Sequence, residues 1–230
     1  MPTSQASEAT SRIEPIVLTD IILYSPDGKP LIRHDKVSLD GEAVRNDGGT
    51  YVMKTQKGWK EYYADRNDGR ELPSLPLMYA IIERLYEQRN PLIGKIIAEI
   101  IDTSGLCTST TIKYAAGTTQ RSRITHEQGR IFYGTQCIIP QGGYSLTDNK
   151  KEEEWETTLQ GLLMPKNLDK AIEVLDSSFR CKSRMLVLNA ELRKEYSKRA
   201  VWLTYSDGLN LYCDLRPDFY FGRSRGVKIE

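Results

Sequence analysis

The residues best suited to chemistry lie in one polar stretch, which separates two apolar segments. The stretch over 118–130 holds an acid–base pair and three arginines: Arg121, Arg123, His126, Glu127 and Arg130. Histidine titrates near neutral pH and arginine binds carboxylates and phosphates, so the group is a candidate site for acid–base or phosphoryl chemistry on an anion. Neighbouring strand residues point to opposite faces, which favours instead a charged hairpin tip or polar connector.

A second candidate surface lies at the C-terminal end, where cations alternate with aromatic rings. Its members are Phe219, Tyr220, Phe221, Arg223, Arg225 and Lys228. Cations neutralise phosphates and exposed rings stack on bases, so the segment is a candidate binding surface for single-stranded nucleic acid. The alternative is that the cations are simply solvated. Gly222 and Gly226 argue against a regular packed strand and keep the binding interpretation open.

Several chemistries lack their usual sequence motifs. The chain has neither a glycine-rich nucleotide-binding fingerprint nor the Gly-X-Ser-X-Gly elbow of serine hydrolases. With two histidines and four scattered cysteines, neither a zinc site nor a disulfide framework is expected. We therefore predict no metal and no cofactor.

Composition limits the classes of partner. The 230 residues carry 32 Lys and Arg against 31 Asp and Glu, a formal charge of +1, so any binding of nucleic acid must be local. No apolar run is long enough to span a membrane, and the first residues do not resemble a signal peptide. We expect a soluble, intracellular, cytoplasmic protein.

The most apolar stretch, Leu75 to Gly105, predicts two consecutive helices. Met78, Ile81, Ile82 and Leu85 recur at the spacing of one helical face, and a second set of isoleucines follows after Asn90-Pro91. The second helix leaves only a narrow polar stripe, with Glu99 in it, so we expect the pair to form the core.

Strands are expected on both sides of this helical pair. A Pro-Asp-Gly turn joins strands over 16–24 and 29–34, short strands are predicted over 51–55 and 59–63, and a Ser-Asp-Gly turn joins the two strands of a C-terminal hairpin. Further strands are predicted over 106–114 and 131–139, and amphipathic helices near 150–163 and 167–179, with a polar helix over 190–199.

The predicted fold class is α+β, with an N-terminal β-hairpin unit, a central helical pair, a mostly antiparallel sheet, further helices and a C-terminal hairpin. Three regions are expected: a flexible N-terminal arm over 1–13, one domain over 14–216 in which 14–72 is a candidate separate β subunit, and a basic-aromatic tail over 217–230.

These features favour a non-enzymatic interaction or assembly protein. Its expected partners are proteins, copies of itself among them, and RNA or single-stranded nucleic acid bound through the basic-aromatic surfaces. The alternative is a small enzyme that acts on an anionic or phosphate-bearing substrate at the Arg121 to Arg130 loop, with His126 and Glu127 as its catalytic candidates.

Overall fold

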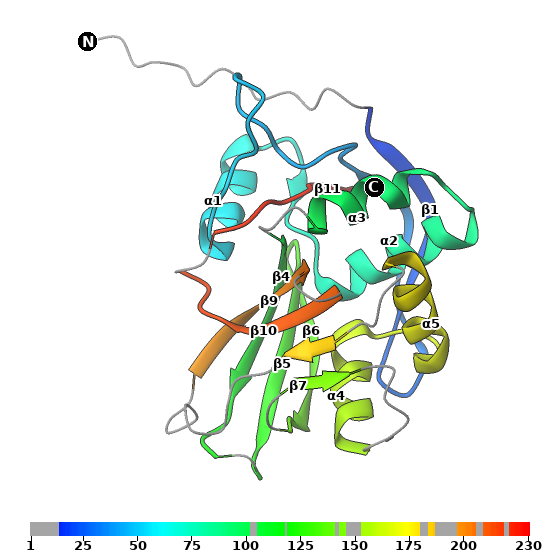
Figure 1. The fold of residues 1–230 in the computed structure, drawn as a ribbon, viewed down its shortest axis with the longest axis vertical. Coiled ribbons are helices and arrows are strands. Elements are labelled where there is room, and N and C mark those ends of the chain that lie inside the picture. The colour runs from blue at the N-terminus through cyan, green and yellow to red at the C-terminus, as the bar shows by residue number, and fades with distance from the viewer. Residues whose placement is uncertain are drawn as a thin grey trace.

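The computed structural model describes residues 14–101, 105–117, 119–140, 143–145, 153–179, 184–186, 197–205, 209–218 and 221–230. They form two sheets and five helices, in agreement with the predicted α+β class (Figure 1). The predicted N-terminal arm over 1–13 lies outside the described residues.

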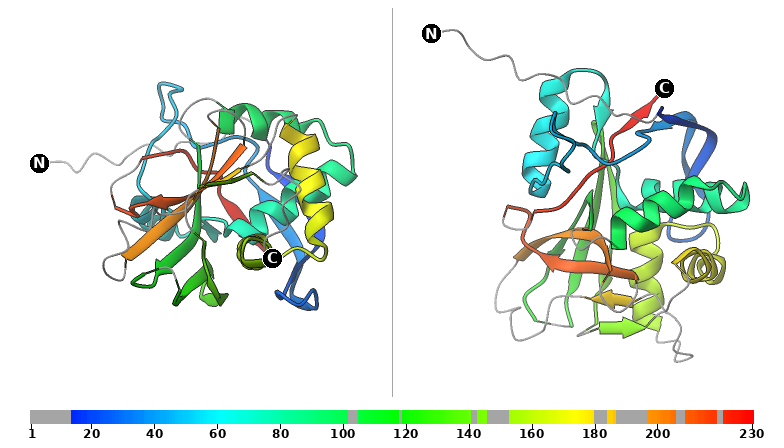
Figure 2. Two further views of the ribbon diagram at one scale, coloured as in Figure 1. Left: turned by 60° about the horizontal axis from the view of Figure 1, so that its bottom comes forward. Right: turned by 45° about the horizontal axis from the view of Figure 1, so that its top comes forward.

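The smaller sheet has four strands and draws on both ends of the chain. The predicted N-terminal hairpin is confirmed as β1 (Ile16–Tyr24) and β2 (Pro30–Leu39). β11 (Val227–Ile229) lies between β2 and the two-residue strand β3 (Arg70–Glu71), antiparallel to each. Figure 2 shows this red C-terminal strand beside the blue N-terminal hairpin.

The larger sheet has seven strands in the order β6-β5-β4-β9-β10-β8-β7, and all its pairs are antiparallel except β8 with β10. Its strands are β4 (Leu106–Tyr114), β5 (Arg121–Gln128), β6 (Ile131–Ile138), β7 (Gly143–Ser145), β8 (Arg184–Leu186), β9 (Ser197–Tyr205) and β10 (Leu209–Leu215). β9 and β10 are the predicted C-terminal hairpin, and β9 pairs with β4 in the middle of the sheet.

The predicted helical pair is confirmed as α2 (Leu75–Glu87) and α3 (Leu92–Ile101). Ser74 caps α2 by accepting a hydrogen bond from the Leu77 N–H. α2 packs against β1 of the smaller sheet and β4 of the larger one, and it also contacts α4 (Glu153–Leu163) and α5 (Leu168–Phe179). The helical pair therefore lies in the main core.

The short strands predicted over 51–55 and 59–63 are wrong. Residues Gln56–Arg66 form helix α1, which Thr55 caps by accepting from the Gly58 N–H. Trp59 and Tyr63 follow the spacing of four residues that places side chains on one helical face, and both are buried. Aromatic residues are enriched in strands, which is why the sequence predicted strands here. In the structure, helix α1 buries these rings against the larger sheet.

Two other expectations need correction. The connector predicted over 118–130 contains β5, an internal strand between β4 and β6, and only Gly129 and Arg130 form the turn that follows it. The polar helix predicted over 190–199 overlaps β9, which begins at Ser197, and residues 190–196 lie outside the described residues. Among the helices of the described part, none is long and apolar enough to cross a membrane.

Candidate nucleic-acid interface

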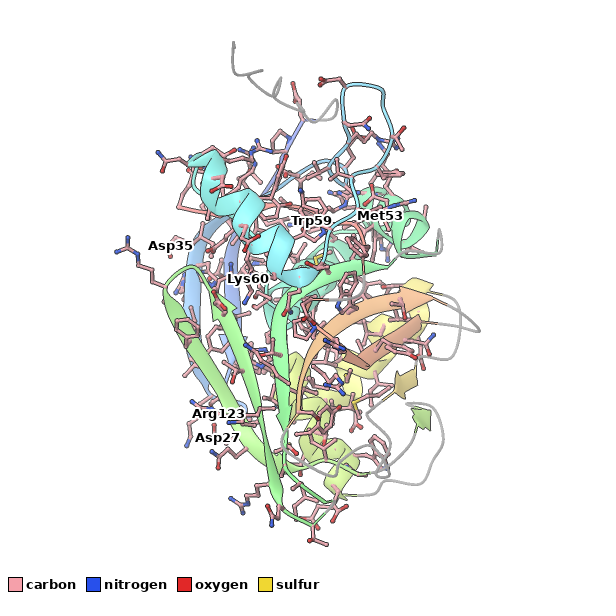
Figure 3. The ribbon with its side chains drawn as sticks, turned by 90° about the vertical axis from the view of Figure 1, so that its left-hand side faces the viewer. Asp27, Asp35, Met53, Trp59, Lys60 and Arg123 are labelled. Atoms are coloured by element: carbon pink, nitrogen blue, oxygen red, sulfur yellow. The ribbon has the colours of Figure 1, made fainter. Side chains whose placement is uncertain are left out.

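Helices cover the two faces of the larger sheet to different extents. On one face α4 packs closely against β5 and β6, since a Cβ at Gly161 would lie 2.6 Å from Thr135 and 3.1 Å from Ile124. On the other face α1 covers only one end, where Trp59 packs in a small second core with Cys107 and Trp202. Beyond α1, none of the described helices covers this face, which we call the open face, and Figure 3 shows Arg123 on this part, away from Trp59 and Lys60 of the helix.

Three cations lie on directly paired positions of three adjacent strands of this open face. Arg123 of β5 is opposite Lys113 of β4, and Lys113 is opposite Lys198 of β9. All three are exposed. We call Lys113, Arg123 and Lys198 the basic row; it extends over two strand spacings, roughly 10 Å.

Arg121 belongs to the same face, because it lies two residues before Arg123 on β5 and is also exposed. Within the described part of the chain, neither Arg123 nor Lys198 forms an ion pair with a carboxylate. Three exposed cations on adjacent strands concentrate positive charge on this part of the sheet, which attracts a polyanion.

His126 is on the other face of β5 and is not brought together with Arg121 or Arg123. Its side chain is 0 % exposed, Nδ1 lies 2.9 Å from Thr110 Oγ1, and Nε2 lies 2.8 Å from the Gly161 carbonyl oxygen. Burial lowers the pKa of His126 to about 4. Both ring nitrogens have partners inside the protein, and the residue serves the packing of α4 on the sheet.

Glu127, the other acid–base candidate, lies at the end of the open face near α1. Its carboxylate forms an ion pair with Lys60 of α1, and the two residues line a cavity of about 250 Å³ with Glu71 and Ser109. Burial raises the pKa of Glu71, which accepts a hydrogen bond from Gln128. Arg130 is exposed in the turn between β5 and β6.

The C-terminal segment was predicted as an exposed surface, and the structure corrects this for its arginines. Arg225 is 1 % exposed; its Nε donates to Glu99 at 2.7 Å and its Nη1 donates to the Asp40 carbonyl oxygen at 2.8 Å. Arg223 is 8 % exposed and lies over the ring of Tyr51, 3.6 Å from its centroid. Both arginines contact residues inside the protein and do not form part of an exposed surface.

The remaining residues of the C-terminal segment differ in their exposure. Phe221 is 62 % exposed, and Lys228 is half-buried in β11. Phe219 and Tyr220 lie outside the described residues. The segment therefore does not present one continuous basic-aromatic surface over the residues that the structure describes.

Sequence reasoning identified Arg121 and Arg123 but missed Lys113 and Lys198 as their neighbours. Lys113 occupied a polar position of a correctly predicted strand, so the alternation contained a signal for its exposed face. Lys198 was assigned to a helix, and its place opposite Lys113 depends on a pairing between residues distant in sequence. Only the fold brings the row together.

Neither a metal site in the described residues nor a similarity to known proteins indicates a function. Over the described residues, no group of three or more His, Cys, Asp or Glu side chains is placed to hold a metal ion. Comparison with known protein families, with curated protein sequences and with solved structures finds no match.

Proposed function

We propose that this chain is a non-enzymatic interaction protein that binds single-stranded nucleic acid, RNA above all, on the open face of its larger sheet. The observation that carries the proposal is the basic row, in which directly opposed strand positions hold Arg123, Lys113 and Lys198. Cations on adjacent strands can contact several phosphates at once, and a nucleic-acid backbone supplies regularly spaced phosphates.

The shape of the surface favours a strand of nucleic acid over a small anion. The exposed cations lie across neighbouring strands on an open face, with Arg121 beside the row, whereas His126 is enclosed on the far face. An extended surface of this kind neutralises successive phosphates and leaves the bases free, so we expect little sequence preference.

The proposal predicts a specific effect of Arg123→Gln. Binding of a labelled single-stranded RNA, followed by fluorescence anisotropy, should weaken several-fold, and the slope of log K against log salt should fall by about 0.7 because one phosphate contact is lost. The melting temperature should stay close to that of the wild type, because Arg123 is exposed.

Arg33→Gln is the matched control. Arg33 is an exposed arginine on β2 of the smaller sheet, with a side chain 65 % exposed. This variant should bind RNA like the wild type. Equal affinity and equal salt dependence for Arg123→Gln and the wild type would contradict the proposed site.

A further inference from the structure

The four sheet edges in the described structure differ in how they are protected against pairing with another chain. β1 carries Asp20 at a φ of 58°, which interrupts its regular pairing and forms an ion pair with Arg33. β3 has two residues and β7 has three. Charge, irregular backbone and short length are the usual means by which proteins block an exposed edge.

β6 is neither charged nor short, and its register with β5 is unbroken, although Gly134 has a positive φ. It is the eight-residue border of the larger sheet, and its sequence Ile-Phe-Tyr-Gly-Thr-Gln-Cys-Ile contains neither a charged residue nor a proline. Ile131 is 52 % exposed and Phe132 is 66 % exposed. A long, uncharged edge with exposed apolar side chains is suited to pairing with another strand.

A hollow lies beside the exposed phenylalanine. Gly134 has a φ of 151°, and a Cβ at this position would lie 2.1 Å from the Ile124 carbonyl oxygen, so the position must remain glycine. Beside it lies a hollow of about 490 Å³, lined among others by Arg123, Phe132 and Gln136. An apolar group from outside would fill it.

We propose that two copies of this chain pair through their β6 strands, antiparallel, about a two-fold axis beside Gly134. The loop between β5 and β6 has two residues, so Gln128 and Ile131 form a hydrogen-bonded pair that closes it. The odd-numbered residues of β6 therefore bond to β5. The backbone N–H and C=O groups of its even-numbered residues point to the free side. In the pair, Gly134 lies opposite Gly134 and Phe132 lies opposite Gln136 of the second copy.

This register makes the edge complementary to itself. Diagonal neighbours across a strand pair lie within reach of an aromatic side chain, so Phe132 of each copy covers the hollow at Gly134 of the other. No charged residues of β6 oppose one another, because the strand has none. In a two-fold symmetric contact the same surface must supply both partners, and β6 carries both the aromatic side chain of Phe132 and the hollow that it would fill. This favours a second copy of the chain over an unrelated peptide.

The pairing also has a consequence for the open face. The even-numbered residues of β6 share their face with Arg123, since Gln136 is paired with it. Strands that pair about an axis perpendicular to the sheet keep that face on the same side, so the two basic rows lie on one continuous surface. The dimer itself does not depend on nucleic-acid binding.

Molar mass in solution tests the proposal. Sedimentation equilibrium or light scattering across a micromolar concentration series should give a dimer for the wild type. Phe132→Lys should give a monomer because it places a charge at the contact, and so should Gln136→Pro because it removes an N–H on the free side. Leu31→Lys, which alters a residue 47 % exposed on β2, should remain dimeric.

A monomeric wild type throughout the series would overturn the proposal. Dimers that persist in both Phe132→Lys and Gln136→Pro would also overturn the proposal. Melting curves of the variants separate loss of pairing from loss of folding. Lys198→Gln changes the basic row on β9, away from β6, and should leave the dimer intact, so the two sites are tested separately.

Cysteine cross-linking tests the register. Residues opposed in a hydrogen-bonded antiparallel pair have Cα atoms about 5.5 Å apart, within the range of a disulfide. On mild oxidation, a mixture of Phe132→Cys and Gln136→Cys proteins should form a covalent dimer, and neither variant alone should do so. Cys107, Cys137 and Cys213 are buried, and Cys181, which lies outside the described residues, is replaced by serine in both proteins. Failure of the mixture to cross-link would overturn this pairing.

Discussion

At the scale of single residues, His126 shows how burial changes the meaning of a side chain. The Gly161 carbonyl oxygen accepts from Nε2, which leaves Nδ1 to accept from the Thr110 hydroxyl. Thr110 Oγ1 in turn accepts from the Leu75 N–H at 2.9 Å. The imidazole is thus held neutral in a chain of hydrogen bonds that joins α2, the sheet and α4.

This arrangement predicts a pH dependence of stability. Folded His126 takes up a proton only near its pKa of about 4, whereas unfolded histidine does so near 6.5. The unfolded state therefore gains protons first as the pH falls, and stability should be lost between about 6.5 and 4, by on the order of 3 kcal/mol.

Urea unfolding of the wild type and of His126→Gln over this pH range measures the effect. The difference in unfolding free energy between the two proteins removes the contributions of the other titrating groups. The wild type should lose stability relative to the variant as the pH falls. A constant difference would show that His126 is not held neutral.

At the scale of elements, the apolar periodicity predicted α2 and α3, but not what covers the polar side of α3. Leu85 and Ile96 are 0 % exposed, as core positions should be. Glu99, expected in a solvent-facing stripe, is buried against Arg225, because the C-terminal segment crosses this side of the helix. A helical period cannot show which distant segment lies on the polar face.

The buried pair predicts a large effect of Arg225→Ala. Removal of the guanidinium leaves the Glu99 carboxylate buried without its counter-charge, and the loss of unfolding free energy should be about 3 to 5 kcal/mol. Arg33→Ala, at an exposed ion pair with Asp20, should cost no more than about 1 kcal/mol. Chemical denaturation checks both, and similar losses in the two variants would contradict a structural role for Arg225.

At the scale of the whole molecule, the sequence predicted more of the fold than of the site. The α+β class, both hairpins and the helical pair followed from local periodicity and turn residues. The placement of β11 between β2 and β3, and of β9 beside β4, depends on contacts between distant segments that no local pattern contains. The basic row needs the second of these pairings, so the sequence could indicate Arg121, Arg123 and the exposed face of Lys113, but not Lys198 beside them.

The most direct measurement of the central claim is the salt dependence of single-stranded RNA binding by the wild type and by a triple variant in which Lys113, Arg123 and Lys198 are each changed to glutamine. If the row contacts three phosphates, the slope of log K against log salt should fall by about 2. The triple variant should remain folded, because all three side chains are exposed. An unchanged slope, or a wild type that binds no RNA at low salt, would contradict the account.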